Sequence, residues 1–194
     1  MARRKFAPAI DSLAQKGARF TQAYANSAVC SASRVGIITG RYQYRLRVGL
    51  EEPIVGYEAA AVAAVVGVVA PNVTLGLVGL PPEAPTLPSL LKGAGYSTYL
   101  VGKWHLGLLP DFGPLKSGYD HFWGFRGGSL DYFSHQVAGV HDLWDDDREV
   151  EEKGYLTELI GTRTAEIIRN QKPGDKPFFI SVHFNAPHWP WEGP

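Results

Sequence analysis

The stretch "PTLPSLLKGAGYSTYLVGK", residues 85–103, places a short helical pattern directly before a strand-like run. Leu87, Leu90 and Leu91 are three and four positions apart, which is the spacing of an apolar helix face, and two glycines end the pattern. The run "STYLVG" that follows is rich in β-branched and aromatic residues. The stretch therefore predicts a helix with three inward leucines and a strand that ends at Lys103.

The same alternation recurs on both sides of this stretch. "GYLTELIGTRTAEIIRNQK", residues 154–172, carries Leu and Ile at helical spacing, and "KPFFISVHF", 176–184, is typical of a buried strand. Towards the N-terminus, "IDSLAQKG", 10–17, and "SASRVGIITGR", 31–41, predict two more helices. Helices alternating with strands indicate an α/β fold with a largely parallel sheet flanked by helices.

Three segments show a less regular pattern. "ARFTQAYA", residues 18–25, alternates like a strand, and residues 107–150 are interpreted as a long surface excursion with an acidic turn at 145–147. Residues 59–80 form an uncharged run long enough to suggest a membrane span. Because Pro71, an asparagine and several glycines interrupt that run, we interpret it as a poorly ordered insertion.

The composition excludes several classes of protein. A chain of 194 residues suits one domain, and its 19 basic residues balance 19 acidic ones, so no net field attracts nucleic acid or a membrane surface. A single cysteine rules out an intramolecular disulfide. The N-terminus has no apolar core after its basic residues and does not match a signal peptide, which leaves the location unassigned.

The one cysteine, Cys30, comes just before the helix predicted over 31–41, and Arg34 follows four residues later. Free N–H groups and the dipole at a helix N-terminus favour an anion, and a guanidinium on the same face adds a forked donor. This spacing is consistent with a nucleophile beside an oxyanion-binding site. The alternative is a buried, inert cysteine with a solvated arginine.

Further polar side chains follow the two predicted strands. Lys103 and His105 point the same way in extended chain, at the strand end where α/β folds bind ligands, and both suit sulfate or phosphate oxygens. His188 leaves the last strand between two prolines that restrict its loop. His183 lies inside that strand and is interpreted as a core histidine. The alternative for the first pair is a loop lysine and a packed histidine.

Two sequence signatures together carry a resemblance to a known family. "CSASR", 30–34, fits Cys-x-Pro/Ala-x-Arg, and "GYSTYLVGKWHLG", 95–107, fits a glycine-aromatic run that ends in Gly-Lys-Trp-His-x-Gly. With "GYDHFWGFRGGSLDYFSH", 118–135, and "PFFISVHFNAPHWPWEGP", 177–194, the chain resembles sulfatases of the arylsulfatase type. The resemblance spans the chain except about 51–80 and implies the alkaline-phosphatase-like α/β fold.

The resemblance implies a reaction at residue 30. A separate formylglycine-generating enzyme would oxidise Cys30 to formylglycine, whose hydrate attacks the sulfur of a small-molecule or glycan sulfate ester. Arg34 would stabilise the hydrate, and His105 would hold its hydroxyl. The remaining matching positions, assigned to contact with the sulfate oxygens, are Lys103, His188 and Ser134.

The family also uses a divalent cation, usually Ca²⁺, with oxygen ligands that include the formylglycine at position 30. The usual Asp-Asp pair would precede residue 7 and the Asp-Asn pair would follow Pro194, so we expect the carboxylate ligands to be absent from this chain. Residues 1–194 are thus interpreted as part of a sulfatase catalytic domain, incomplete at both ends and weakly active or inactive alone, with an atypical Ala/Val/Gly-rich insertion at 51–80.

Two other functions remain open at this point. A phosphodiester or phosphonate monoester hydrolase of the same superfamily can share the cysteine motif. A non-catalytic module could keep Arg34, Lys103 and His188 to bind a sulfated ligand without metal. Family members are often periplasmic, secreted or lysosomal, and the sequence does not choose among these locations.

Overall fold

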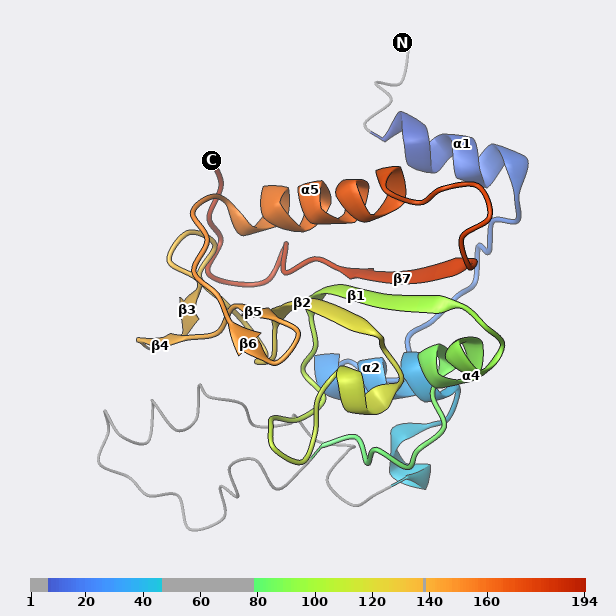
Figure 1. Ribbon diagram of the computed structural model, residues 1–194, viewed down its shortest axis with the longest axis horizontal. Coiled ribbons are helices and arrows are strands. Elements are labelled where there is room, and N and C mark those ends of the chain that lie inside the picture. The colour runs from blue at the N-terminus through green and yellow to red at the C-terminus, as the bar shows by residue number, and fades with distance from the viewer. Residues whose placement is uncertain (1–6, 47–78, 138) are drawn as a thin grey trace.

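The computed structural model describes residues 7–46, 79–137 and 139–194 (Figure 1). The insertion expected at 51–80 lies outside the described residues, apart from its last two positions. Among the described residues, no helix is long and apolar enough to cross a membrane.

A five-stranded sheet forms the centre of the described structure, in the order β6-β5-β2-β1-β7. Strand β1 (Ser97–Lys103) pairs in parallel with β2 (His121–Phe125) on one side and β7 (Phe178–His183) on the other. Beyond β2, the antiparallel strands β5 (Trp144–Asp145) and β6 (Arg148–Glu149) extend the sheet. Strands β3 (Gln136–Val137) and β4 (Val140–His141) form a separate antiparallel pair. The predicted α/β fold with a mostly parallel sheet is confirmed.

Helices cover both faces of the sheet (Figure 1). Helix α5 (Leu156–Arg169) lies on one face, and α2 (Cys30–Thr39) and α4 (Leu87–Gly93) lie on the other. The remaining helical elements are α1 Pro8–Lys16 and the 3₁₀ turns η1 Gln43–Arg45 and η2 Leu115–Ser117. The predicted helices at 10–17, 31–41 and 154–172 are therefore all present, with α2 beginning one residue early, at the cysteine itself.

Alternation along β1 divides the core into two layers. Leu100 packs with Val35 of α2 on one face, whereas Val101 packs with Leu156 and Ile160 of α5 on the other. Successive side chains of a strand point to opposite faces, so each layer receives every second residue. The sheet is thus buried on both faces, as a parallel sheet requires.

Helix α4 shows one prediction that is wrong. Thr86 caps the helix by accepting the Ser89 N–H while Ser89 Oγ accepts the Thr86 N–H, so the start is set as the sequence indicates. However, Leu87 is 44% exposed and Leu90 65% exposed. In a helix of seven residues at the rim of the sheet, the buried contact is made by Pro88 instead.

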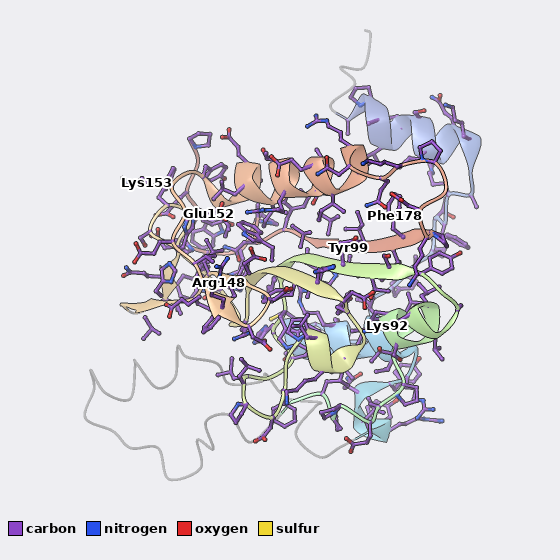
Figure 2. All side chains as sticks on the ribbon, viewed as in Figure 1. Lys92, Tyr99, Arg148, Glu152, Lys153 and Phe178 are labelled. Carbon is purple, nitrogen blue, oxygen red and sulfur yellow. The ribbon has the colours of Figure 1, made fainter. Side chains whose placement is uncertain are left out.

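Three other sequence interpretations need correction. Residues 18–25 form no strand, because that segment consists of bends and irregular chain. Residues 107–150 are not a surface excursion, since they contain β2, four of whose five residues are buried. Strand β7 is not buried throughout: it is the last strand of the sheet among the described residues, and Phe178 at its start is 38% exposed (Figure 2).

Candidate active site

Cys30 is the first residue of α2, and its sulfur is held against a histidine from β1's end. Cys30 Sγ lies 3.2 Å from His105 Nδ1. His105 is 7% exposed and has a left-handed backbone (φ 60°), a conformation that costs free energy in a residue other than glycine. His105 lies two residues after the end of β1, and this backbone conformation places its imidazole against the first residue of α2.

Ser27 forms hydrogen bonds with residues on both sides of Cys30, at the start of α2. Its hydroxyl accepts the Val29 N–H at 3.0 Å, and its carbonyl accepts the Ser33 hydroxyl at 2.6 Å. These contacts tie the chain on both sides of Cys30 to one turn. The thiol is therefore placed by local side-chain hydrogen bonds at a helix N-terminus, where the dipole stabilises negative charge.

Arg34 lies one helical turn after Cys30 and reaches the ends of two parallel strands. Its Nη1 donates to the Lys103 carbonyl at 3.0 Å and lies 2.9 Å from His183 Nδ1. The same His183 nitrogen lies 2.9 Å from the Lys103 carbonyl. The arginine, the last residue of β1 and the last residue of β7 thus form one compact cluster.

Burial sets the electrostatics of this cluster. It lowers the pKa of the Arg34 guanidinium, while the charges of Cys30 and Tyr119 act in the opposite direction. Burial, and after it the positive charge of Arg34, lowers the pKa of His183 to about 4, partly opposed by the contact with the Lys103 backbone. At neutral pH the cluster therefore holds a cationic guanidinium against a neutral imidazole.

A cavity of about 290 Å³ opens between α2, α4 and the sheet beside these groups. Cys30, Arg34 and His183 line it on the polar side. Its other walls are mostly apolar and include Ile37, Ile38, Leu87, Pro88, Trp104, Leu106 and Phe179. The Cys30 thiol and the Arg34 guanidinium thus border a space with a largely apolar wall, where charge interactions are stronger than in water.

The other predicted site residues lie at the same edge of the sheet or on loops beyond it. Lys103, the last residue of β1, is 3% exposed. His188 follows β7; Tyr132 donates to its carbonyl at 2.9 Å, and its ring contacts Trp189 at 5.8 Å between centroids. Ser134 is exposed in a turn where its N–H donates to Asp131 at 2.6 Å. The structure therefore brings Cys30 to His105 and Arg34 to the Lys103 carbonyl, whereas the His188 carbonyl is bound by Tyr132 and Ser134 by Asp131 of its own turn.

His183 is the member of the cluster that the sequence interpretation missed, because it was assigned to the core. Alternation along β7 places Phe179, Ser181 and His183 on the face that α2 covers. His183 pairs in register with Gly102, one residue before Lys103. Its place at the end of a strand that precedes His188 was the available signal.

The described residues around Cys30 do not provide the ligands that a hard divalent cation prefers. Hard cations such as Ca²⁺ take six to eight oxygen ligands, many from carboxylates. Within the described ranges, no group of three or more His, Cys, Asp or Glu side chains could hold a metal ion. The contacts of Cys30 and Arg34 are nitrogen groups and one backbone carbonyl. This donor set does not fit calcium.

Nearly the whole chain is similar to known sulfatases. The family model for sulfatases matches residues 2–194. Arylsulfatase J of Mus musculus is 34% identical over 96% of the chain, and N-acetylgalactosamine-6-sulfatase of Sus scrofa is 32% identical over 94%. The chain spans only 29% and 35% of those two proteins, about a third of their length.

Solved structures agree with the sequence comparison. The crystal structure of Ps i-CgsB superimposes with a TM-score of 0.76 at 29% identity, covering 94% of this chain and 40% of that one. BT4656, solved in complex with its substrate D-glucosamine-2-N,6-O-disulfate, gives a TM-score of 0.66 at 28% identity, covering 95% and 30%. With the cysteine motif at the start of α2 and a family match over nearly every residue, the chain belongs to the sulfatase family.

Proposed function

We propose that this protein is a sulfuric ester hydrolase of the arylsulfatase type that acts through residue 30. The observation that carries the proposal is the placement of Cys30 at the first position of α2, with His105 Nδ1 3.2 Å from its sulfur and Arg34 one turn further on. A residue that must carry negative charge during a reaction is favoured at a helix N-terminus beside a buried guanidinium.

The roles of the surrounding groups follow from their chemistry. Once a maturation enzyme has oxidised the Cys30 side chain to an aldehyde, its hydrate would supply an oxygen nucleophile. The imidazole of His105 is within reach to hold and deprotonate a hydroxyl at that position. Arg34 offers a fixed positive charge near the same atom. Lys103 and His188 are assigned to the sulfate oxygens, with Ser134 as a further polar contact.

A sulfated sugar is the substrate class that we propose. Ps i-CgsB has been solved in complex with k-i-k-neocarrahexaose, and BT4656 with D-glucosamine-2-N,6-O-disulfate. Both proteins resemble this chain over at least 95% of its length in those complexes. The exposed rings of Trp189 (54%) and Trp191 (86%), next to His188, offer aromatic faces on which a sugar ring can stack.

The maturation step gives the first test. Co-expression with a formylglycine-generating enzyme should replace the CH₂SH group of Cys30 with CHO, which intact-mass spectrometry and peptide mapping detect. The Cys30→Ala variant provides the blank. Unmodified Cys30 after co-expression would contradict the proposal and support a non-catalytic anion-binding module.

Matched substrates and matched variants give the second test. Even if its turnover is slow, the converted protein should hydrolyse an aryl sulfate faster than the corresponding aryl phosphonate; the reverse preference would indicate a phosphonate monoester hydrolase. Arg34→Ala should lower kcat/KM about a hundredfold, the usual loss for a donor that stabilises developing charge. Arg41→Ala is the control, because Arg41 is exposed just after α2 and should leave the rate nearly unchanged. Equal losses in both variants would contradict the role of Arg34.

A further inference from the structure

The ring of His183 closes a triangle of polar contacts at the ends of β1 and β7. Arg34 Nη1 lies 3.0 Å from the Lys103 carbonyl and 2.9 Å from His183 Nδ1, and the third side, from Nδ1 to the carbonyl, is 2.9 Å. His183 also borders the cavity that Cys30 and Arg34 line. The imidazole is therefore in direct contact with the cation of the candidate active site, although the imidazole belongs to β7 and the cation to α2.

The proton count decides which of these contacts are hydrogen bonds. A guanidinium nitrogen carries only donors, two on Nη1, whereas a neutral imidazole has one N–H and one lone pair. If the proton is on Nε2, Nη1 can donate one hydrogen to the Lys103 carbonyl and the other to His183 Nδ1. If the proton is on Nδ1, that N–H can donate to the Lys103 carbonyl at 2.9 Å, but Nδ1 then offers no acceptor to the permanent cation 2.9 Å away. The charge-assisted bond from Arg34 is the stronger alternative, so it favours the Nε2–H tautomer.

We propose that His183 is a positioning residue for Arg34: its Nδ1 accepts a hydrogen bond from Nη1 and, with the Lys103 carbonyl, sets the orientation of the guanidinium beside residue 30. The inference rests on the proposed function, in which Arg34 serves the reaction at that residue. Two acceptors on separate strands hold one terminal nitrogen, which restricts rotation of the planar guanidinium. Such preorganisation removes a reorganisation cost from the reaction.

A pair of substitutions of equal size separates positioning from packing. His183→Asn keeps an acceptor oxygen close to the position of Nδ1, whereas His183→Leu fills similar space without an acceptor. In the converted protein, His183→Leu should lower kcat for an aryl sulfate about tenfold or more, since misplacement of a catalytic group is costly. His183→Asn should recover most of that loss, and KM should change little in either variant.

Thermal unfolding of the two variants provides the control. Similar Tm values with different kcat values support positioning; equal kcat losses in the two variants, or losses that follow Tm, would overturn it. If the wild-type protein lacks sulfatase activity altogether, the proposed function fails and this kinetic comparison cannot be made, so a second measurement is needed that does not depend on turnover.

That measurement is the tautomer of His183 in the 194-residue chain. Long-range ¹H–¹⁵N correlation spectra of the imidazole should show a proton on Nε2 and a bare Nδ1 at neutral pH. Arg34→Gln should raise the pKa of His183, because it removes the second-largest cause of its low value. A proton on Nδ1, or a His183 pKa that is insensitive to Arg34, would overturn the assignment whether or not the protein is active.

Discussion

Gly102 allows the close approach of strands that brings Lys103 and His183 together, and its replacement by alanine should be severe. Gly102 has φ +108°, a region that L residues rarely adopt, and it pairs in register with His183 of β7 and Gly124 of β2. A Cβ on Gly102 would lie 2.0 Å from the His183 carbonyl oxygen and 2.8 Å from its carbon. Both atoms belong to the backbone, so no side chain can rotate away to relieve the contact.

The expected cost has two parts. The unfavourable φ should cost about 1–2 kcal/mol, the usual penalty for an L residue in left-handed backbone. A carbon normally stays about 3.3 Å from a carbonyl oxygen, so β7 must also move by more than ~1 Å, and such overpacking costs a further ~1–3 kcal/mol. We therefore expect Gly102→Ala to lower the free energy of unfolding by about 2–5 kcal/mol.

Gly95→Ala is the matched control, because it makes the same chemical change with only the first part of the cost. Gly95 lies in the turn before β1, has φ +91°, and its Cβ would meet no atom within 4 Å. Urea unfolding followed by tryptophan fluorescence measures both variants. Equal losses of unfolding free energy in the two variants would contradict this expectation, since the approach of β1 to β7 would then add no cost.

Two further predictions concern buried charge. Arg126 has a fully buried side chain that donates to Asp147 at 2.7 Å and stacks over Trp144, so Arg126→Leu should destabilise the fold by ~3 kcal/mol; Arg148→Leu, on the surface (Figure 2), should change it by less than ~0.5 kcal/mol in the same urea assay. The pKa of His183 is 6.5 in the unfolded chain and about 4 in the fold, so the unfolded state binds the extra proton between these values. Stability should fall by ~3 kcal/mol as the pH drops from 7 to 4, and His183→Asn should lose this part of the profile; an unchanged profile would show that another group is responsible.

Local sequence signals were enough for most elements of the fold. Helix α5 follows from apolar residues at helical spacing, and the start of α4 from Thr86 and the residues after it. Strand β2 could not be found in this way, because "HFWGF" is short and buried at four of its five positions, so it shows no alternation between faces. It forms a strand because it pairs with β1, and this pairing depends on a distant segment rather than on its own residues.

In the candidate site as well, local contacts could be predicted from the sequence and long-range contacts could not. Cys30 and Arg34 are four residues apart on one helix, so their proximity could be derived from spacing alone. The contact of Arg34 with His183 joins residues 149 positions apart, and a local pattern says only which face of a strand His183 occupies. The exposure of Leu90 was missed for a similar reason: periodicity identifies an apolar stripe, but the length and edge position of α4 decide whether another layer covers it.

Lys103 contributes two separate groups to the site, and the structure indicates how to distinguish them. Its side chain is proposed to contact sulfate, whereas its carbonyl accepts from Arg34 and lies against His183. Lys103→Ala removes the amine and leaves the carbonyl in place, so it should impair turnover without changing the His183 tautomer. Gly102→Ala displaces the backbone and should change both. We therefore expect the geometry of the site to depend on the main chain at the end of β1, whereas anion binding is proposed to depend on the Lys103 side chain.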